Sequence, residues 1–217
     1  MLKAVVFDLD DTLYREYDYV KSGFHAVADY LEEPEIFNKL IELYQINKKN
    51  VFQRMGLTDY DCQKCIEIYR NHFPKLSLPD DVIKTLTVLK KNKFKLGIIT
   101  DGRVEGQHNK LQALGLYELV PKVIITDTFG IEFRKPHPKS FECMREYLEV
   151  QFDEMMYVGD NPQKDFYIRK TYPIYTVRID NFEKGLYGNT QYYGNVTENL
   201  RIKRIDELLD VLNIREE

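Results

Sequence analysis

The sequence contains few cysteines, three in 217 residues, and their number is odd. Disulfide frameworks need paired cysteines and are typical of short secreted chains, so the cysteine content argues against one. Cys62 and Cys65 form a single C-x-x-C in "LTDYDCQKCIEIYRNH", where apolar residues recur at the spacing of an amphipathic helix. No second pair completes a zinc site, so we interpret both thiols as groups that pack within this helix.

Long apolar stretches are also missing. The sequence has no run near the roughly 20 apolar residues that are needed to cross a bilayer. Only Met1 to Lys3 precede the first predicted strand, which leaves no space for the charged and apolar regions of a signal peptide. We therefore predict a cytoplasmic protein with no membrane partner.

The sequence lacks an excess of positive charge and the common glycine-rich nucleotide loops. Its formal net charge is −4, which offers nucleic acid no long-range attraction. Neither G-x-G-x-x-G nor G-x-x-x-x-G-K occurs, which disfavours a dinucleotide cofactor or an ATPase. The four histidines form no metal-binding pattern, since three lie in helical patterns and one lies between two prolines.

Short segments rich in Val, Ile and Tyr alternate with helical patterns along most of the chain. The first strand-like segment begins at Ala4, and the others cover 93–100, 121–126, 154–160 and 172–179, with helical patterns at 81–91, 104–114, 138–148 and 205–214. These segments are too continuously apolar for half-exposed antiparallel strands, which indicates a parallel sheet covered on both faces. The alternation predicts an α/β fold with a Rossmann-like, doubly wound parallel sheet.

One long stretch interrupts this alternation. Between the first two predicted strands, helical patterns cover 17–33, 34–50 and 57–72, with Pro34 near the start of the second and Gly56 in the turn before the third. We predict an all-helical cap subdomain at 15–78, inserted into a core formed by 1–14 and 79–217. A long helical crossover is the alternative. The Gly-, Asn- and Tyr-rich segment 181–200 is predicted to be a packed loop.

Polar residues gather where the predicted strands end. They are Asp8, Asp10, Asp11 and Thr12 after the first strand, Thr100 and Asp101 after the second, Lys135 after the third, and Asp160 and Asp165 after the fourth. In an open parallel sheet, ligands bind beyond the carboxyl ends of the strands, near the point where strand order reverses. The shared position of these residues therefore predicts one site.

Asp8 and Asp10 stand two residues apart at a strand end, so their carboxylates point the same way and repel each other. A hard divalent cation relieves this repulsion, and Asp160 is placed to supply a third oxygen ligand. The alternative is an acidic turn that caps the next helix. Taken alone, Thr100 and Asp101 fit a helix cap or an anion site equally well.

Lys135 precedes Pro136, which restricts the backbone and favours a defined inward position over a solvated surface charge.

The polar residues that follow the four predicted strands together resemble the ordered motifs of the haloacid dehalogenase-like hydrolase superfamily. These motifs read "DLDDT", Thr100 in "IITDG", Lys135 in "FRKPHP", and Asp160 with Asp165 in "VGDNPQKD". The resemblance covers essentially the whole chain, including the helical insertion after the first motif.

The resemblance implies a role for each of these residues. Asp8 would be the nucleophile that forms an aspartyl-phosphate, and Asp10 would act as general acid and then general base. Mg²⁺ would be bound by the Asp8 carboxylate, the Asp10 backbone carbonyl and Asp160, with Asp165 as a supporting residue. Thr100 and Lys135 would bind phosphate oxygens. Asp101 stands where many relatives have Asn, so we expect its side chain to turn away and only its backbone N–H to bind substrate.

These features predict a magnesium-dependent phosphatase, a monomer or small homo-oligomer, that acts on a small phosphorylated metabolite. A haloacid dehalogenase is one alternative, but that branch lacks the aspartate found here at position 10. A sugar-phosphate mutase usually carries Gly where Asp11 stands, and a phosphonate hydrolase needs a Schiff-base lysine such as Lys21. A non-catalytic phosphate-binding module is the remaining alternative. For substrate contacts from the cap, Arg15, Tyr17 and Arg54 are the candidates.

Overall fold

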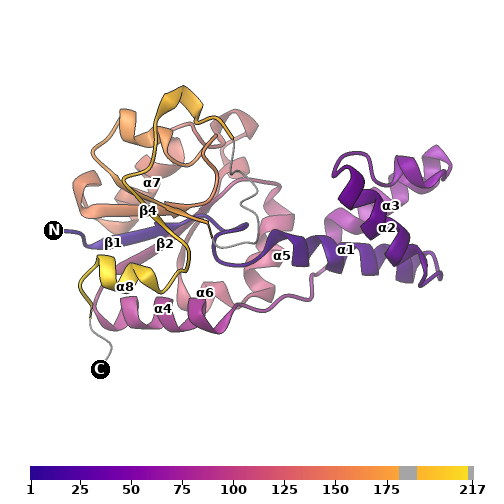
Figure 1. The fold of residues 1–217 in the computed structure, drawn as a ribbon, viewed down its shortest axis with the longest axis horizontal. Helices are drawn as coiled ribbons and strands as arrows, with labels where there is room; N and C mark the ends of the chain where they lie inside the picture. Colours follow the sequence, from indigo (N-terminus) through magenta and orange to yellow (C-terminus); the bar gives the residue numbers. More distant parts are fainter. Residues whose placement is uncertain (181–189, 215–217) are drawn as a thin grey trace.

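The computed structural model describes residues 1–180 and 190–214. Within them, six parallel strands form one sheet in the order β3-β2-β1-β4-β5-β6 (Figure 1). The strands are β1 (Ala4–Phe7), β2 (Lys95–Thr100), β3 (Lys122–Ile125), β4 (Met155–Gly159), β5 (Tyr175–Ile179) and β6 (Leu200–Ile202). Strand order reverses between β1 and β4, which places the switch point beside the end of β1. The predicted Rossmann-like α/β fold is confirmed.

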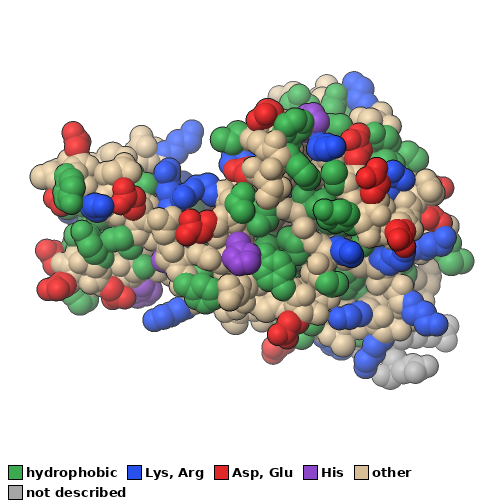
Figure 2. All heavy atoms as spheres, turned by 180° about the vertical axis from the view of Figure 1, so that it is seen from behind, with side chains coloured by type: hydrophobic (Ala, Val, Ile, Leu, Met, Phe, Trp, Pro, Cys, Tyr) green, Lys and Arg blue, Asp and Glu red, His purple; other side chains and the backbone are tan. Residues whose placement is uncertain are grey.

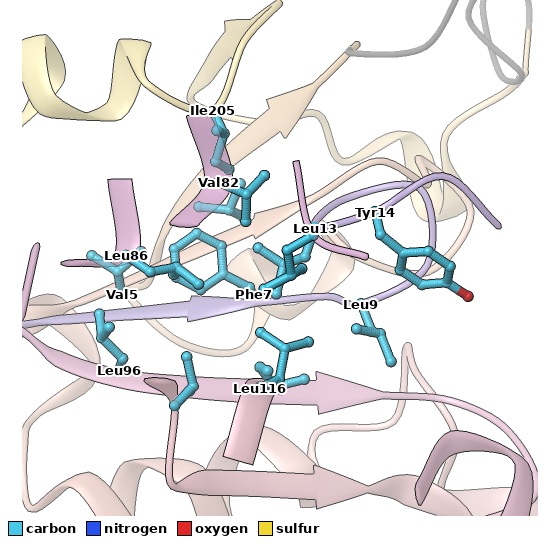
Figure 3. Packing of buried hydrophobic residues seen from close by; sticks show 14 of the residues in the cluster. Val5, Phe7, Leu9, Leu13, Tyr14, Val82, Leu86, Leu96, Leu116 and Ile205 are labelled. Atoms are coloured by element: carbon cyan, nitrogen blue, oxygen red, sulfur yellow. The ribbon is translucent and has the colours of Figure 1, made fainter. Parts of the chain in front are cut away.

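Alternate residues of β1 face two separate hydrophobic clusters. Val5 and Phe7 pack on the face covered by the helices α4 (Asp80–Lys91), α5 (Val104–Ala113), α6 (Leu116–Leu119) and α8 (Glu207–Val211). Figure 3 shows Phe7 among Val82, Leu86 and Leu116 of these helices. Ala4 and Val6 pack on the other face, against α7 (Lys139–Leu148). Because both faces of the strand are covered, all four of its residues are buried, and the residues that follow it are held in place.

Three helices between β1 and α4 form a separate lobe, which we call the helical insertion (residues 16–71). They are α1 (Glu16–Tyr30), α2 (Ile36–Ile46) and α3 (Asp59–Asn71), and Figure 1 shows them beside the sheet rather than on either of its faces. The insertion has its own hydrophobic cluster, which includes Phe24, Leu40 and Phe52. Both thiols of the C-x-x-C are buried and free, and Cys65 belongs to this cluster. Figure 2 shows an indentation between the insertion and the core.

Shorter elements connect these units. Six 3-10 helices lie at Gln53–Met55, Thr126–Thr128, Ile131–Phe133, Phe152–Glu154, Tyr167–Lys170 and Tyr193–Asn195 in the described part of the chain. The segment 181–200 was predicted to be a loop, but 181–189 lie outside the described residues. Its end differs from the prediction, because β6 begins at Leu200 and pairs with β5. No helix of the described residues combines the length and the apolar character that a membrane span needs.

Candidate active site

Asp8 continues the path of β1 into the site. Its backbone N–H donates to the carbonyl of Val158 on β4, at 2.8 Å, so the residue is held one position past the strand end. The side chain is 1% exposed. Oδ1 accepts from Lys135 Nζ at 2.7 Å, whereas Oδ2 is buried without a hydrogen-bond partner among the described residues. A buried carboxylate oxygen in this state is poised to bind a cation or to react.

Lys135 is fully buried beside Asp8, on the loop between β3 and α7, and its peptide bond to Pro136 is cis. Its ammonium group donates to Asp8 Oδ1 at 2.7 Å, Asp165 Oδ1 at 2.9 Å and the Tyr157 hydroxyl at 2.7 Å. Burial alone would lower the pKa of Lys135, but the two carboxylates raise it well above its usual range. This lysine therefore stays charged and links the two aspartates.

Asp8, Asp160 and Asp165 form a buried cluster in which one oxygen of each lies within 4.8 Å of the others. Asp165 is committed to protein groups, because Oδ1 binds Lys135 and Tyr157 while Oδ2 accepts from the backbone N–H of Asn161 at 2.8 Å. Burial, together with the charges of Asp165 and Asp8, raises the pKa of Asp160 to about 9. Burial also raises the pKa of Asp8 above its usual value. The raised pKa values of Asp8 and Asp160 thus follow from the burial of carboxylates close to one another.

The Asp10 carboxylate turns away from this cluster toward α5. It accepts from the Tyr14 hydroxyl at 2.5 Å, Lys110 Nζ at 2.7 Å and Gln107 Nε2 at 2.9 Å. Burial would raise the pKa of Asp10, but the Lys110 charge and these hydrogen bonds hold it below its usual value. Gln107 Nε2 also donates to the Thr100 hydroxyl at 2.5 Å, so one side chain joins the ends of β1 and β2.

Asp101 differs from the expectation that its side chain turns away from the site. Oδ1 accepts from the Thr126 hydroxyl at 2.9 Å and from the backbone N–H of Lys135 at 3.0 Å. Oδ2 lies 3.6 Å from Lys164 Nζ, and the same ammonium lies 3.7 Å from Asp8 Oδ2. Burial would raise the pKa of Asp101, but Lys135 and Lys164 hold it below its usual value. The carboxylate is therefore ionised within the site, where two lysines balance its charge.

Asp11, whose role the sequence left open, joins the strand end to the insertion. The residue is buried and has a left-handed backbone with φ of 53°. Its Oδ1 accepts from the backbone N–H of Glu16 at 2.8 Å, which satisfies one of the unpaired donors at the start of α1. Asp11 thus orients the first helix of the insertion relative to the site.

Arg15, Tyr17 and Arg54 are the residues proposed for substrate contact from the insertion. Arg15 is exposed, and its guanidinium lies 5.3 Å from the ring centroid of Tyr17. Arg54 has a different set of contacts from the one expected, because its guanidinium donates to the backbone carbonyls of Leu43 at 2.9 Å and Asn47. These carbonyls close α2, so Arg54 stabilises the insertion itself.

A cavity of about 280 Å³ lies within the insertion. Its lining combines aromatic rings with cations and includes Phe24, Tyr44, Lys48, Phe52 and Arg70. The charge of Lys48 also acts to lower the pKa of Asp11, although burial leaves that pKa raised. Lys48 therefore stands close enough to influence the site at the end of β1.

Sequence reasoning missed five residues that contact the predicted set: Tyr14, Gln107, Lys110, Tyr157 and Lys164. Gln107 and Lys110 stand three positions apart, so they share the face of α5 that meets Asp10. A polar pair at this spacing, on the helix that follows "TDG", could have been predicted from the sequence to face the site. Lys164 stands next to Asp165 inside a quoted motif, but nothing in the sequence distinguishes it from a surface lysine.

Comparison with known proteins identifies the family. Residues 5–175 match the haloacid dehalogenase-like hydrolases. The glyceraldehyde 3-phosphate phosphatase of Methanocaldococcus jannaschii is 32% identical over 98% of this chain and 97% of its own. The pyrophosphatase PpaX of Bacillus cereus is 27% identical over 74% of this chain and 75% of its own.

A solved structure agrees with these matches. The phosphatase of this superfamily from Thermococcus onnurineus is 26% identical and superposes with a TM-score of 0.62, covering 97% of this chain and 98% of that one. The sequence match covers the residues that follow the ends of β1, β2, β3 and β4. This chain belongs to the haloacid dehalogenase-like hydrolases.

Proposed function

We propose that the protein hydrolyses a small phosphorylated metabolite through an aspartyl-phosphate on Asp8. The observation that carries this proposal is the state of the Asp8 carboxylate, which is buried, held at Oδ1 by Lys135, and without a hydrogen-bond partner at Oδ2 among the described residues. A nucleophile needs one fixed orientation and one oxygen available for attack. The relatives named as phosphatases support the same class of reaction.

The carboxylate cluster fits a divalent cation. Asp8 and Asp160 both have raised pKa values, and their oxygens lie within 4.8 Å of each other and of Asp165. Hard oxygen donors of this kind suit Mg²⁺. We propose that Asp8, Asp160 and the Asp10 backbone carbonyl bind it, while Asp165 supports them through Lys135. When bound, Mg²⁺ would neutralise charge on the carboxylates and on the phosphoryl oxygens.

In the proposed reaction, Asp8 Oδ2 forms a bond to phosphorus as the bond to the leaving oxygen breaks. Asp10 donates a proton to that oxygen, and later accepts a proton from the water that releases phosphate from Asp8. The contact with Lys110 keeps Asp10 ionised in the free protein, which suits the second step. For the first step Asp10 must carry a proton, so substrate binding has to weaken that contact.

Two observations favour a phosphatase over the alternatives. The Asp10 carboxylate accepts hydrogen bonds from three side chains, which indicates a defined role that a dehalogenase does not need. Asp11 stands where a sugar-phosphate mutase usually has Gly, and here its carboxylate is used to start α1. A binding module of the same fold requires no set of paired carboxylates, so it explains less of the site.

We propose that the helical insertion acts as a cap that sets substrate choice. It packs around its own cluster and joins the core through two connections, near residue 15 and at 72–79, so it can move as a unit. Figure 2 shows Lys and Arg side chains near the indentation between the two lobes, which suits an anionic substrate. Sugar phosphates, phosphorylated acids and pyrophosphate are the classes to compare first.

The test is a screen of phosphorylated metabolites with Mg²⁺, followed by the variant Asp8→Asn. An amide cannot attack phosphorus to give a stable acyl phosphate, so turnover of every substrate found should fall to background. Release of inorganic phosphate is the measurement. Asp153→Asn is the matched control, because this exposed aspartate lies on the short helix before β4, at the opposite end of that strand from the site. Turnover by Asp8→Asn at the wild-type rate would rule out the mechanism.

A further inference from the structure

We infer that Gln107 is a positioning residue that prepares Thr100 and Asp10 for the same phosphoryl group. The inference rests on the proposed phosphatase function, in which Asp10 transfers protons and Thr100 is expected to bind a phosphoryl oxygen. Gln107 lies on α5, outside the motifs that predicted the site, and is 4% exposed. Its amide group contacts both residues at once.

The amide nitrogen of Gln107 joins the two residues directly. Nε2 donates to Asp10 Oδ2 at 2.9 Å and to the Thr100 hydroxyl oxygen at 2.5 Å, so each of its two hydrogens has one acceptor. An ionised carboxylate can only accept hydrogen bonds, so the nitrogen of the amide, and not its oxygen, must face Asp10. The orientation of the amide is therefore fixed by the charge beside it.

This contact determines where the Thr100 hydroxyl can donate. Thr100 is the last residue of β2 and is fully buried. Its oxygen accepts from Gln107, and its own O–H donates to no protein group among the described residues. A hydroxyl has one proton to donate, so this proton stays available for an oxygen of the ligand. Gln107 thus makes Thr100 a donor, which is the state that a phosphoryl oxygen requires.

Gln107 also sets the orientation of the Asp10 carboxylate. Tyr14 and Lys110 both donate to Oδ1, whereas Oδ2 accepts from Gln107 alone in the part of the chain that the structure describes. Because one nitrogen binds both Oδ2 and the Thr100 hydroxyl, the group that protonates the leaving oxygen is held next to the group that binds the phosphoryl oxygen. A fixed separation of this kind keeps catalytic groups in a productive geometry.

The loop after β2 holds the Gln107 side chain in this position. A Cβ at Gly102 would lie 3.2 Å from both Cγ and Cδ of Gln107, which is closer than ordinary van der Waals contact. The glycine of "TDG" therefore gives the loop room to pack directly on this side chain. The backbone N–H of Gln107 donates to the Arg103 carbonyl at 3.0 Å, in the first turn of α5. The side chain is thus confined between the loop and its two acceptors.

The first test measures the binding of inorganic phosphate to the magnesium-loaded protein by calorimetry. Gln107→Leu should weaken binding by about tenfold, because the Thr100 proton is no longer directed toward the ligand. In a Thr100→Ala background the same change should have much less effect, since the hydroxyl through which Gln107 acts is absent. Gln112→Leu, the same substitution at an exposed position of α5, is the matched control and should bind as wild type does.

The second test compares kcat/KM for two substrates, p-nitrophenyl phosphate and the best alkyl phosphate found in the metabolite screen. This constant covers the steps up to the departure of the leaving group. An alkoxide needs a proton from Asp10 to leave, whereas the stable p-nitrophenolate needs little help. Gln107→Leu should therefore lower kcat/KM for the alkyl phosphate at least about tenfold more than for p-nitrophenyl phosphate. A variant that was merely less stable would lower both to the same extent.

Gln107→Glu keeps the shape of the side chain, but a carboxyl group can donate to at most one of the two oxygens, so it should show the same pattern. Phosphate affinity equal to wild type, or an unchanged ratio of the two kcat/KM values, in the folded Gln107 variants would overturn the inference. Hydrolysis of both substrates at an unchanged ratio leaves the phosphatase without this role for Gln107. Phosphate binding that depends on Gln107 through Thr100, in a protein that hydrolyses neither substrate, removes the phosphatase and retains the positioning of Thr100.

Discussion

Among the individual residues, Asp10 and Lys110 form a buried ion pair whose removal should change the free energy of unfolding by a measurable amount. Lys110 Nζ lies 2.7 Å from Asp10 Oδ1, and the two side chains are 6% and 19% exposed. The ammonium also lies 4.3 Å from the ring centroid of Tyr19, at the start of the insertion. Removing one partner from such a pair leaves the other charge buried and unbalanced, which destabilises more than the pair itself stabilises.

Lys110→Met should therefore lower the free energy of unfolding by about 3 kcal/mol at pH 7. The difference in stability from wild type should narrow as pH falls below about 4. The Lys110 charge holds the folded-state pKa of Asp10 below its usual 3.8, so the pair stabilises fully above pH 3.8, and this stabilisation is lost as pH falls through the lower folded-state pKa. Urea unfolding at several pH values is the measurement.

The control for this prediction is Lys110→Arg, which keeps a positive charge near Asp10. It should retain most of the stability and most of its pH dependence, although the contact with Tyr19 changes in shape. Other titrating groups are common to all three proteins and cancel in the differences. A Lys110→Met variant as stable as wild type at pH 7 would show that the pair adds nothing to the fold.

The residues that follow strands were predictable, and those that support them were not. Asp8, Thr100 and Asp160 end buried parallel strands, so the edge that they share follows from the pattern alone. Lys110 reaches Asp10 from 100 positions away, and the packing of α5 decides which of its faces meets the site. Lys164 and Asp101 pair through a loop conformation that no periodicity records. Long-range packing therefore decided which lysines belong to the site.

At the scale of elements, the end of β4 is the most tightly constrained part of the site. Gly159 closes this strand directly before Asp160. A Cβ at Gly159 would lie 2.6 Å from Asp165 Oδ2 and 2.7 Å from its Cγ. Asp165 has little freedom to move aside, since Lys135, Tyr157 and the backbone of Asn161 all bind its carboxylate. A glycine is required here by close approach rather than by an unusual φ.

Gly159→Ala should reduce turnover on the order of 100-fold, because displaced Asp165 shifts Lys135 and through it the Asp8 carboxylate. The same overpacking should lower the free energy of unfolding by about 2 kcal/mol. Steady-state rates and chemical denaturation measure the two effects. Gly106→Ala is the matched control, since this α5 position has its nearest neighbours at 3.9 Å and Ala favours a helix. Equal activities of the two variants would contradict the prediction.

The elements themselves differ in how readily the sequence revealed them. β1, β2 and β4 are largely apolar and central in the sheet, and their predicted positions agree with the structure within a few residues. β6 has three residues at the edge of the sheet, of which only Ile202 is buried, so it offers too short a pattern to detect. The predicted helices of the insertion end one to four residues beyond the observed ones, because apolar spacing marks a helix more clearly than it marks its last residue.

Across the whole molecule, the site links the stability of the fold to pH and to metal. The core sheet places Asp8 and Asp160 side by side, and with the charges of Asp165 and Asp8 the burial of Asp160 raises its pKa to about 9. Between about pH 4 and pH 9, Asp160 of the folded protein without metal therefore holds a proton that the same residue releases in the unfolded chain. This difference should lower the stability of the fold as pH rises through the range, because ionising Asp160 is less favourable in the folded state than in the unfolded one.

Mg²⁺ should reverse this trend, because it binds the ionised cluster of the folded protein and not the dispersed carboxylates of the unfolded chain. The rise in Tm on adding Mg²⁺ should be small at pH 5.5 and large at pH 8, where protons compete less. Asp160→Asn should melt higher than wild type at pH 8 in a chelator, and should lose most of the Mg²⁺ effect. Asp153→Asn should behave as wild type. A rise in Tm that is independent of pH, or equal in Asp160→Asn, would place the metal elsewhere, since only binding at the buried carboxylates couples proton release to the stability of the sheet.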